Sequence, residues 1–328
     1  MRPFSYSRAT AIDDALAALR DPSTRLLAGG TNLLDLMKGD VEHPAALVDI
    51  TRLPLAEVKE LPDGGLRIGA LVRNSDAANH PLVRTRYPLL SQAFVAGASP
   101  QLRNMATVGG NLLQRTRCHY FYDVAYRECN KRAPGTGCAA REGHNRQHAI
   151  LGASEQCVAT HPSDMAVALA ALDAVVQVRG PNGGRSIPLA DFHRLPGDTP
   201  ERDTNLARDE LIVAVDLPPS PFAGHAHYLK VRDRASYAFA LVSVAAALDI
   251  DAGRVRNVRI ALGGVAHKPW RALDAERRLV GNPLASQAIV AAGTAAVAGA
   301  RPLSGNAFKV KLAERAVVQA LRTAGGLA

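Results

Sequence analysis

The chain has 328 residues, of which 47% are hydrophobic and 21% charged, and it carries a formal net charge of +9. This is an ordinary globular composition, and no apolar run reaches the roughly 18 residues that a membrane-spanning helix needs. The basic residues form no long tract and accompany no recognisable nucleic-acid-binding module, so we expect neither nucleic acid as a partner nor insertion into a membrane.

The N-terminal part of the chain alternates helices with short strands. Helical spacing of apolar residues predicts a helix over 9–20, and short buried strands are expected at 25–28 and 46–50, with a glycine turn and a helix between them. Such a β-turn-α-β unit is compatible with parallel pairing. An alternating strand over 64–71 and a helix over 85–97 follow.

The second half of the chain begins with a cap-like sequence. Ser163-Asp164 precedes an apolar helix, a strand follows, and PNGG at 181–184 turns that strand back into a hairpin. A strand over 210–218 ends at two prolines, so we place a domain boundary near residue 220. The elements expected beyond it are two long strands of one antiparallel sheet and two helices, over 237–250, 255–265, 284–300 and 306–324.

Two double-glycine turns are candidate ligand sites. Gly29-Gly30 separates an expected strand from an expected helix, and Gly109-Gly110 lies in the apolar stretch ATVGGNLL. Glycine allows close approach of a ligand, and neighbouring backbone N–H groups bind phosphate. AGGTN matches neither GxGxxG nor a Walker loop, so a purely structural turn is the alternative. Two such turns can hold one pyrophosphate from two sides, which favours a dinucleotide.

All four cysteines lie between residues 118 and 157, in an arginine-rich segment with the spacing C-x10-C-x8-C-x18-C. Three explanations remain open from this spacing: two disulfides, a zinc site and a four-thiolate iron–sulfur cluster. Disulfides suit an oxidising compartment, and the CxxC pairs typical of structural zinc are absent from the sequence. The nearby histidines are interpreted as surface residues; they are His119, His144, His148 and His161.

Several ordered motifs resemble one family of redox proteins. They are LLAGGTNLLDLMK (26–38), QLRNMATVGGNLL (101–113), THPSDMAVALAALDA (160–174), YLKVRDRASYAFALVSVAAAL (228–248) and GGVAHKPWRA (263–272). In this order they look like the FAD-binding subunits of the molybdenum hydroxylases, which include xanthine dehydrogenase, aldehyde oxidoreductase and carbon monoxide dehydrogenase. The match spans nearly the whole chain. The family's P-x-x-D motif is one residue shorter here, as Pro162-Ser163-Asp164.

The resemblance implies an α+β fold in two domains. Residues 1–219 would form a two-part FAD-binding domain of the PCMH type, with a small β-α-β subdomain and a larger mixed-sheet subdomain. Residues 220–328 would form a domain like the C-terminal domain of carbon monoxide dehydrogenase flavoproteins, an antiparallel sheet with helices. An insertion over about 114–159 would interrupt the first domain, and it contains every cysteine.

The resemblance also implies which residues bind FAD. Asp164 with Ser163 would hold the ribose and adenosine end, Ile212 would border the flavin or the adenine, and Lys230 would approach the pyrimidine edge of the flavin. The residues that would enclose the pyrophosphate from the first turn are Arg25, Leu26, Leu27, Ala28, Gly29, Gly30, Thr31, Asn32 and Leu33. Those of the second side of the site are Leu102, Ala106, Thr107, Gly109, Gly110 and Asn111.

A subset of the family carries a [4Fe-4S] cluster in such an insertion, and the segments around Cys118–Cys138 and Cys157 look especially like the flavin subunit of periplasmic-type aldehyde oxidoreductases. The implied ligands are Cys118, Cys129, Cys138 and Cys157. The surrounding arginines would offset the negative charge of a tetrathiolate cluster and raise its potential.

The function implied is that of an oxidoreductase subunit without a catalytic acid or base of its own. FAD and the [4Fe-4S] cluster on this chain would pass electrons to an external acceptor. A large subunit with the molybdopterin cofactor would oxidise an aldehyde, and a small subunit would supply [2Fe-2S] clusters. The alternatives are a flavin subunit of a xanthine dehydrogenase or 4-hydroxybenzoyl-CoA reductase type enzyme and, remotely, a zinc-containing basic binding module.

The N-terminal stretch MRPFSYSRATAIDDAL lacks the apolar core of a signal peptide. We therefore expect no export signal on this chain, which is cytoplasmic by its own sequence. Export of the folded complex on a partner's twin-arginine signal would place it in the periplasm.

Overall fold

A small parallel sheet begins the fold. The structure, a computed structural model, describes residues 1–327. Strands β1 (Ser5–Arg8), β2 (Thr24–Leu27) and β3 (Ala46–Asp49) pair in the order β1-β3-β2, with both pairings parallel. Helices α1 (Ile12–Ala18) and α2 (Leu33–Lys38) connect them. The predicted β-turn-α-β unit is confirmed, whereas β1 was not predicted from the sequence.

A five-stranded sheet forms the larger part of the first domain. Its order is β4-β5-β8-β6-β7, and every pairing is antiparallel, so the mixed sheet implied by the resemblance is corrected in this respect. The PNGG hairpin is present between β6 and β7. The strands are β4 (Val58–Glu60), β5 (Leu66–Gly69), β6 (Val175–Gly180), β7 (Gly183–Pro188) and β8 (Leu211–Leu217).

Short helices connect β5 to β6. The helix expected over 85–97 is divided in two, because Pro88 begins a new helix directly after α4. The helices of this region, with the one that follows β7, are α3 (Asn74–Asn79), α4 (Pro81–Arg86), α5 (Pro88–Ala96), α6 (Pro100–Arg103), α7 (Val108–Leu112), α8 (His119–Tyr122), α9 (Asp164–Ala171) and α10 (Leu189–Phe192).

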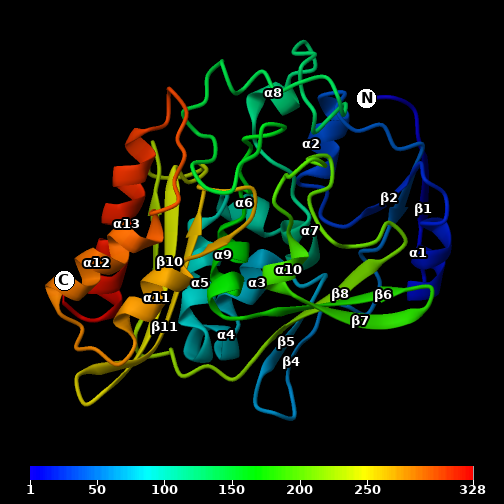
Figure 1. Cartoon of the computed structure of the whole chain (residues 1–328). Coiled ribbons are helices and arrows are strands. Elements are labelled where there is room, and N and C mark those ends of the chain that lie inside the picture. Colours follow the sequence, from blue (N-terminus) through cyan, green and yellow to red (C-terminus); the bar gives the residue numbers. More distant parts are fainter. Residues whose placement is uncertain (328) are drawn as a thin grey trace.

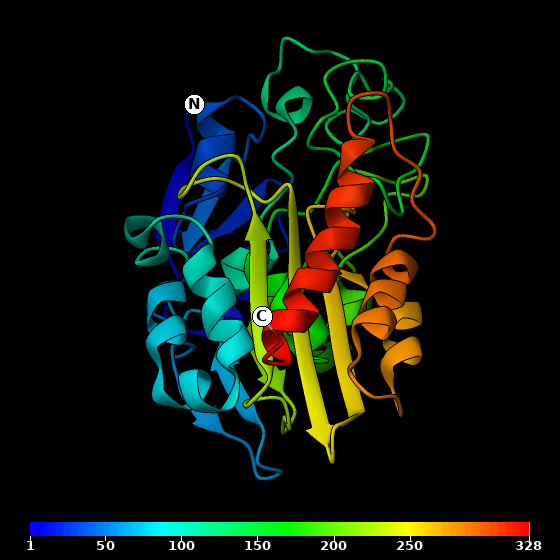
Figure 2. The same ribbon diagram turned by 90° about the vertical axis from the view of Figure 1, so that its left-hand side faces the viewer.

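The third sheet is antiparallel and has helices on both faces (Figure 2). Its order is β12-β11-β10-β9, and α13 (Phe308–Ala324) crosses one face while α5 and α9 cover the other. The strands are β9 (Ala226–Val231), β10 (Val242–Asp251), β11 (Arg254–Gly263) and β12 (Trp270–Arg271). The other two helices are α11 (Leu273–Leu279) and α12 (Ser286–Ala296).

The strand expected over 237–250 begins five residues later than predicted, at Val242. Residues 237–241 instead belong to the loop between β9 and β10, where Tyr237 has a φ of 50° and Tyr237 and Phe239 are exposed. Since such a φ does not fit a strand, pairing with β9 ends at Val242 opposite Val231.

The two parts of the chain share one hydrophobic core. Leu169 and Val215 from the first part pack in the same buried cluster as Tyr228 and Ala245 from the second. The cysteine insertion lies at the end of the molecule where α2 and α13 also meet it, drawn at the top of Figure 1. Within residues 1–327 no helix is long and apolar enough to cross a bilayer.

Candidate functional site

The first glycine turn lies directly against the segment that precedes the second. A methyl group on Gly29 would stand 2.0 Å from the carbonyl oxygen of Met105, a backbone atom that cannot move aside like a flexible side chain. Only glycine therefore allows the first turn to approach the segment that precedes α7. The next residue, Gly30, has a φ of +71°, which glycine adopts without strain.

A cavity of about 420 Å³ follows the first turn and reaches α7 and β8. Its lining includes thirteen of the residues predicted to bind FAD. They are Arg25, Leu26, Leu27, Ala28, Gly29, Gly30, Thr31, Asn32, Leu33, Thr107, Gly109, Gly110 and Ile212. We call it the first cavity.

A second cavity of about 570 Å³ adjoins the first, because both are lined by Thr31, Asn32 and Gly110. We call it the second cavity. The predicted residues that line the second cavity but not the first are Leu102, Ala106, Asn111 and Asp164. The loop before β10 contributes Tyr237 and Phe239, two residues that the sequence pattern had placed in a strand and not in a site.

Ser163 lies at the start of α9 and joins it to the second turn. Its hydroxyl accepts a hydrogen bond from the backbone N–H of Ala166 at 2.9 Å and donates one to Oδ1 of Asn111 at 2.6 Å. The expected cap is therefore present. Ser163 lines a smaller cavity that also borders Asp164, not the first or the second cavity.

Asp164 and Lys230 form a buried ion pair. The Nζ of Lys230 donates to Oδ2 of Asp164 at 2.7 Å and to the carbonyl oxygen of Ala96 at 3.0 Å, and the lysine side chain is only 4% exposed. The resemblance placed Asp164 at the adenosine end of FAD and Lys230 at the flavin end. The structure places the two side chains in direct contact.

The four cysteines line one small cavity although up to 39 positions separate them in sequence, from Cys118 to Cys157. All four are free thiols, and Cys129 and Cys138 face each other in an isolated antiparallel bridge. Burial raises the pKa of Cys118 to about 12 and that of Cys157 to about 11. Without a bound cation these thiols are therefore protonated at neutral pH.

Within residues 1–327 no three His, Cys, Asp or Glu side chains converge closely enough to hold a single metal ion. This geometry does not favour the zinc alternative, in which four ligands meet at one atom. In a four-iron cluster each thiolate binds a different iron, so the ligands surround a wider space. The four thiols match a four-iron cluster in number, and the cavity that they line has a volume of about 10 Å³.

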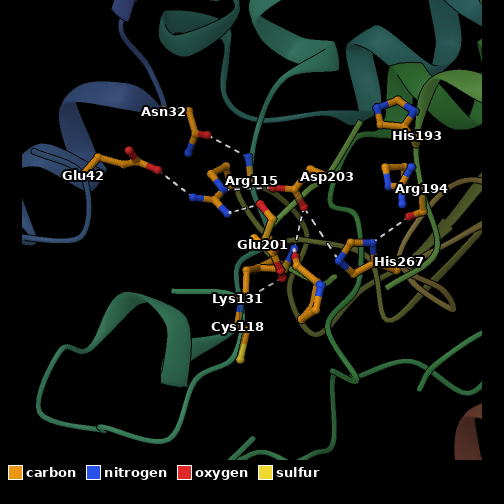
Figure 3. Close-up of polar contacts among 12 residues, drawn as sticks. Asn32, Glu42, Arg115, Cys118, Lys131, His193, Arg194, Glu201, Asp203 and His267 are labelled. Carbon is orange, nitrogen blue, oxygen red and sulfur yellow. Dashed lines mark hydrogen bonds and ion pairs between the residues drawn. The ribbon is translucent and has the colours of Figure 1, made fainter. Parts of the chain in front are cut away.

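A buried ion network joins the cysteine cavity to the first cavity (Figure 3). Lys131, which lines the cysteine cavity and is 1% exposed, contacts Oδ1 of Asp203 at 2.6 Å. The other carboxylate oxygen of Asp203 accepts from Nε of Arg115 at 2.9 Å, and Nη1 of Arg115 donates to Glu42 at 2.6 Å. Arg115 and Glu42 both line the first cavity.

The network also reaches the first glycine turn, because the backbone N–H of Arg115 donates to Oδ1 of Asn32 at 2.8 Å. Burial opposes ionisation of Asp203, yet the ammonium of Lys131 and the guanidinium of Arg115 hold the pKa of its carboxyl well below the usual range. Asp203 is therefore ionised at neutral pH and links three segments by charge. No sequence motif marks Asp203, which lies far from both partners in the chain.

One of the histidines that were interpreted as surface residues is a neighbour of a thiol. His148 is buried, and its Nε2 lies 3.1 Å from Sγ of Cys118. His161 is buried as well and contacts His193, with ring centroids 4.3 Å apart and the ring planes tilted by 50°. The surface interpretation was wrong for these two residues because contacts between the insertion and the two domains cover them.

The chain matches two family descriptions that together span almost all of it. "FAD binding domain in molybdopterin dehydrogenase" matches residues 2–220, and "CO dehydrogenase flavoprotein C-terminal domain" matches residues 227–324. The FAD-binding subunit PaoB of an aldehyde oxidoreductase of Escherichia coli K12 is 55% identical over 99% of both chains. The medium chain of a glyceraldehyde dehydrogenase of Sulfolobus acidocaldarius is 30% identical over 86% of this chain and 82% of its own length.

A solved structure has the same fold. It is a carbon monoxide dehydrogenase chain of Hydrogenophaga pseudoflava, which superposes with a TM-score of 0.78 and is 28% identical over 100% of this chain and 99% of its own. The α+β fold with an antiparallel C-terminal sheet is confirmed by this likeness. The chain therefore belongs to the FAD-binding subunits of the molybdenum hydroxylase family.

Proposed function

We propose that this chain is the FAD- and [4Fe-4S]-carrying electron-transfer subunit of a molybdenum-dependent aldehyde oxidoreductase. The observation that carries the flavin part is the pair of adjoining cavities whose shared lining comes from the two glycine turns. The aldehyde part is supported by the aldehyde oxidoreductase relative, which is 55% identical, whereas a putative xanthine dehydrogenase FAD-binding subunit is 28% identical.

The pyrophosphate of FAD is assigned to the place where the cavities adjoin, at Thr31, Asn32 and Gly110. The adenosine then occupies the first cavity beside Ile212, and the flavin occupies the second beside the Asp164–Lys230 pair. This orientation replaces the adenosine role of Asp164 implied by the resemblance. A lysine behind the flavin suits its chemistry, because reduced flavin carries negative charge near N1 and O2.

The cluster is assigned to the cavity lined by the four cysteines, and the supporting observations are their convergence and the buried cation Lys131 in the same wall. Because the pKa values of Cys118 and Cys157 are raised, these thiols would lose their protons only on binding the cluster. When bound, FAD exchanges electrons singly or in pairs and the cluster exchanges one at a time. The chain itself supplies position and charge.

We further propose two partner subunits and an external electron acceptor. If all four cysteines bind the cluster, the chain has none left for a [2Fe-2S] cluster, so these clusters belong to a small subunit and the molybdopterin cofactor to a large one. The names of the relatives as a medium chain and a medium subunit support such an assembly.

Counting cofactors tests the proposal. The complex, co-expressed with its partner subunits and purified anaerobically, should contain one FAD per copy of this chain. Replacing Cys129 with serine should remove about four irons from the complex and leave the FAD. Ser154→Ala is a matched control in the insertion, because it removes the hydrogen bonds of this hydroxyl with Gly197 and Gln156 but no thiol. Absence of FAD would refute the flavin assignment, and an unchanged iron count in Cys129→Ser would refute the cluster.

A further inference from the structure

Strand β9 presents two polar side chains to the start of α9. Tyr228 and Lys230 are two positions apart, so they lie on the same face of the strand. The hydroxyl of Tyr228 donates to Oδ1 of Asp164 at 2.8 Å, and the ammonium of Lys230 donates to Oδ2 at 2.7 Å. Each carboxylate oxygen of Asp164 therefore has one donor from the C-terminal sheet.

Tyr228 is fixed in this position by its surroundings. Its side chain belongs to the core shared by the two parts of the chain, and its backbone N–H donates to Oε1 of Gln92 at 2.8 Å. The residue is 6% exposed, so water cannot take the place of Asp164 as the acceptor of its hydroxyl. Burial and the nearby carboxylate raise the pKa of Tyr228 well above its usual value, so the phenol keeps its proton.

The positive potential that Lys230 exerts at the second cavity depends on how much of its charge Asp164 offsets. Asp164 lines the second cavity, whereas Lys230 stands behind it and has Asp164 and Ala96 as its hydrogen-bond acceptors. With Tyr228 in place, the hydrogen bond from its phenol stabilises part of the negative charge on the Asp164 carboxylate. Without that donor the carboxylate would interact with the ammonium alone and offset more of its positive charge.

We propose that Tyr228 is a positioning residue for the flavin, whose hydroxyl orients Asp164 and thereby preserves the positive potential of Lys230 at the second cavity. This inference rests on the proposed function, because it requires the flavin in that cavity. It adds a residue that lines neither cavity itself and acts through another side chain. Removal of the hydroxyl should disfavour reduced flavin, which carries the negative charge that Lys230 stabilises.

The test compares Tyr228→Phe with Tyr87→Phe in the complete complex. Tyr87 is a matched control, since it is 1% exposed and its hydroxyl donates to the carbonyl oxygen of Pro218 at 2.8 Å, away from both cavities. Each variant loses one phenol hydroxyl and its hydrogen bonding. FAD content is measured first, and the ratio of reduced to oxidised flavin is then read from the visible spectrum during a mediated redox titration.

At the ambient potential that half-reduces the wild-type flavin, we expect the ratio of reduced to oxidised flavin in Tyr228→Phe to be lower by about threefold or more. A hydrogen bond to a charged group changes an equilibrium constant by roughly tenfold or more, and only part of this effect reaches the flavin. Tyr87→Phe should keep the wild-type ratio. Equal ratios in all three proteins would overturn the inference, as would an equal shift in both variants. A wild-type complex without flavin would overturn the proposed function, and this inference with it.

The role through Asp164 has its own check. In an Asp164→Asn background the charge that Tyr228 orients is gone, so adding Tyr228→Phe should leave the flavin ratio unchanged from that of Asp164→Asn alone. A further shift of the same size in the double variant would show that Tyr228 acts by another route and would contradict the inference.

Discussion

Replacing Asp203 with asparagine removes the charge at the centre of the network between the cysteine cavity and the first cavity. Lys131 would keep the carbonyl oxygen of Pro200, 2.6 Å from its Nζ, but no buried counter-ion, and its side chain is only 1% exposed. Arg115 would retain Glu42 as a partner. The loss of stability should therefore come mainly from the buried ammonium of Lys131, which is left without a counter-ion.

The size of the effect follows from burial. Removing one partner of a buried ion pair costs about 3–5 kcal/mol, and because asparagine keeps one oxygen as an acceptor we expect about 3 kcal/mol. At roughly 2–4 °C per kcal/mol, the Tm should fall by about 6–12 °C. Since the folded pKa of Asp203 lies below its unfolded value, the difference should be complete at neutral pH and should shrink as the pH falls below about 4.

Thermal unfolding followed by circular dichroism measures this difference. Asp216→Asn is the matched control, because Asp216 accepts two hydrogen bonds of 2.7 Å from Arg67, whose side chain is 37% exposed. Asp216 is itself 14% exposed and also accepts a hydrogen bond from Gln177, but because the cation of this pair reaches water its loss should cost only about 1 kcal/mol. A loss of stability in Asp203→Asn no larger than that in Asp216→Asn would refute the role assigned to the network.

Two further predictions concern the FAD cavities and the response to acid. Gly110→Ala should lower the affinity for FAD by roughly tenfold or more, because the new methyl group lies 3.0 Å from Oγ1 of Thr107 where the cavities adjoin. In a flavin titration the control Gly224→Ala, whose methyl group meets nothing within 4 Å, should bind FAD like the wild type. Equal binding by the two variants would contradict the site. Burial lowers the pKa of His193 to about 4, so its neutral form is favoured by folding, and the resulting stability is complete above about pH 6.5 and lost toward pH 4. Between pH 6.5 and 4 the free energy of unfolding of His193→Gln, obtained from thermal melts, should fall by roughly 3 kcal/mol less than that of the wild type. An equal fall in both proteins would contradict this assignment.

Local patterns in the sequence predicted much of the fold and the glycine turns. The alternation of glycines with apolar runs was enough to place β2, α2 and the parallel unit, because these elements are adjacent in the chain. Gly29 and Gly110 could be recognised as sites of close approach for the same reason. The cysteines were grouped by sequence, but their convergence on one cavity is a property of the irregular insertion and needed the structure.

The remaining parts of the site depend on contacts between distant segments. Asp203 meets Lys131 across 72 positions, and Tyr228 meets Asp164 across 64. A buried charge or hydroxyl has no periodicity of its own, so neither pair can be read from spacing. The same limit applies to the ion pair of Asp164 and Lys230, which spacing alone does not reveal.

The most direct test of the proposed function is the anaerobic reduction of the assembled complex by an aldehyde. We predict that the visible absorbance of the flavin on this chain bleaches on addition of the aldehyde, and that a Gly110→Ala complex depleted of FAD shows no such change while its other redox centres are still reduced. Flavin that stays oxidised in the wild-type complex while the other centres are reduced would contradict the account, as would flavin that responds to xanthine and not to the aldehyde.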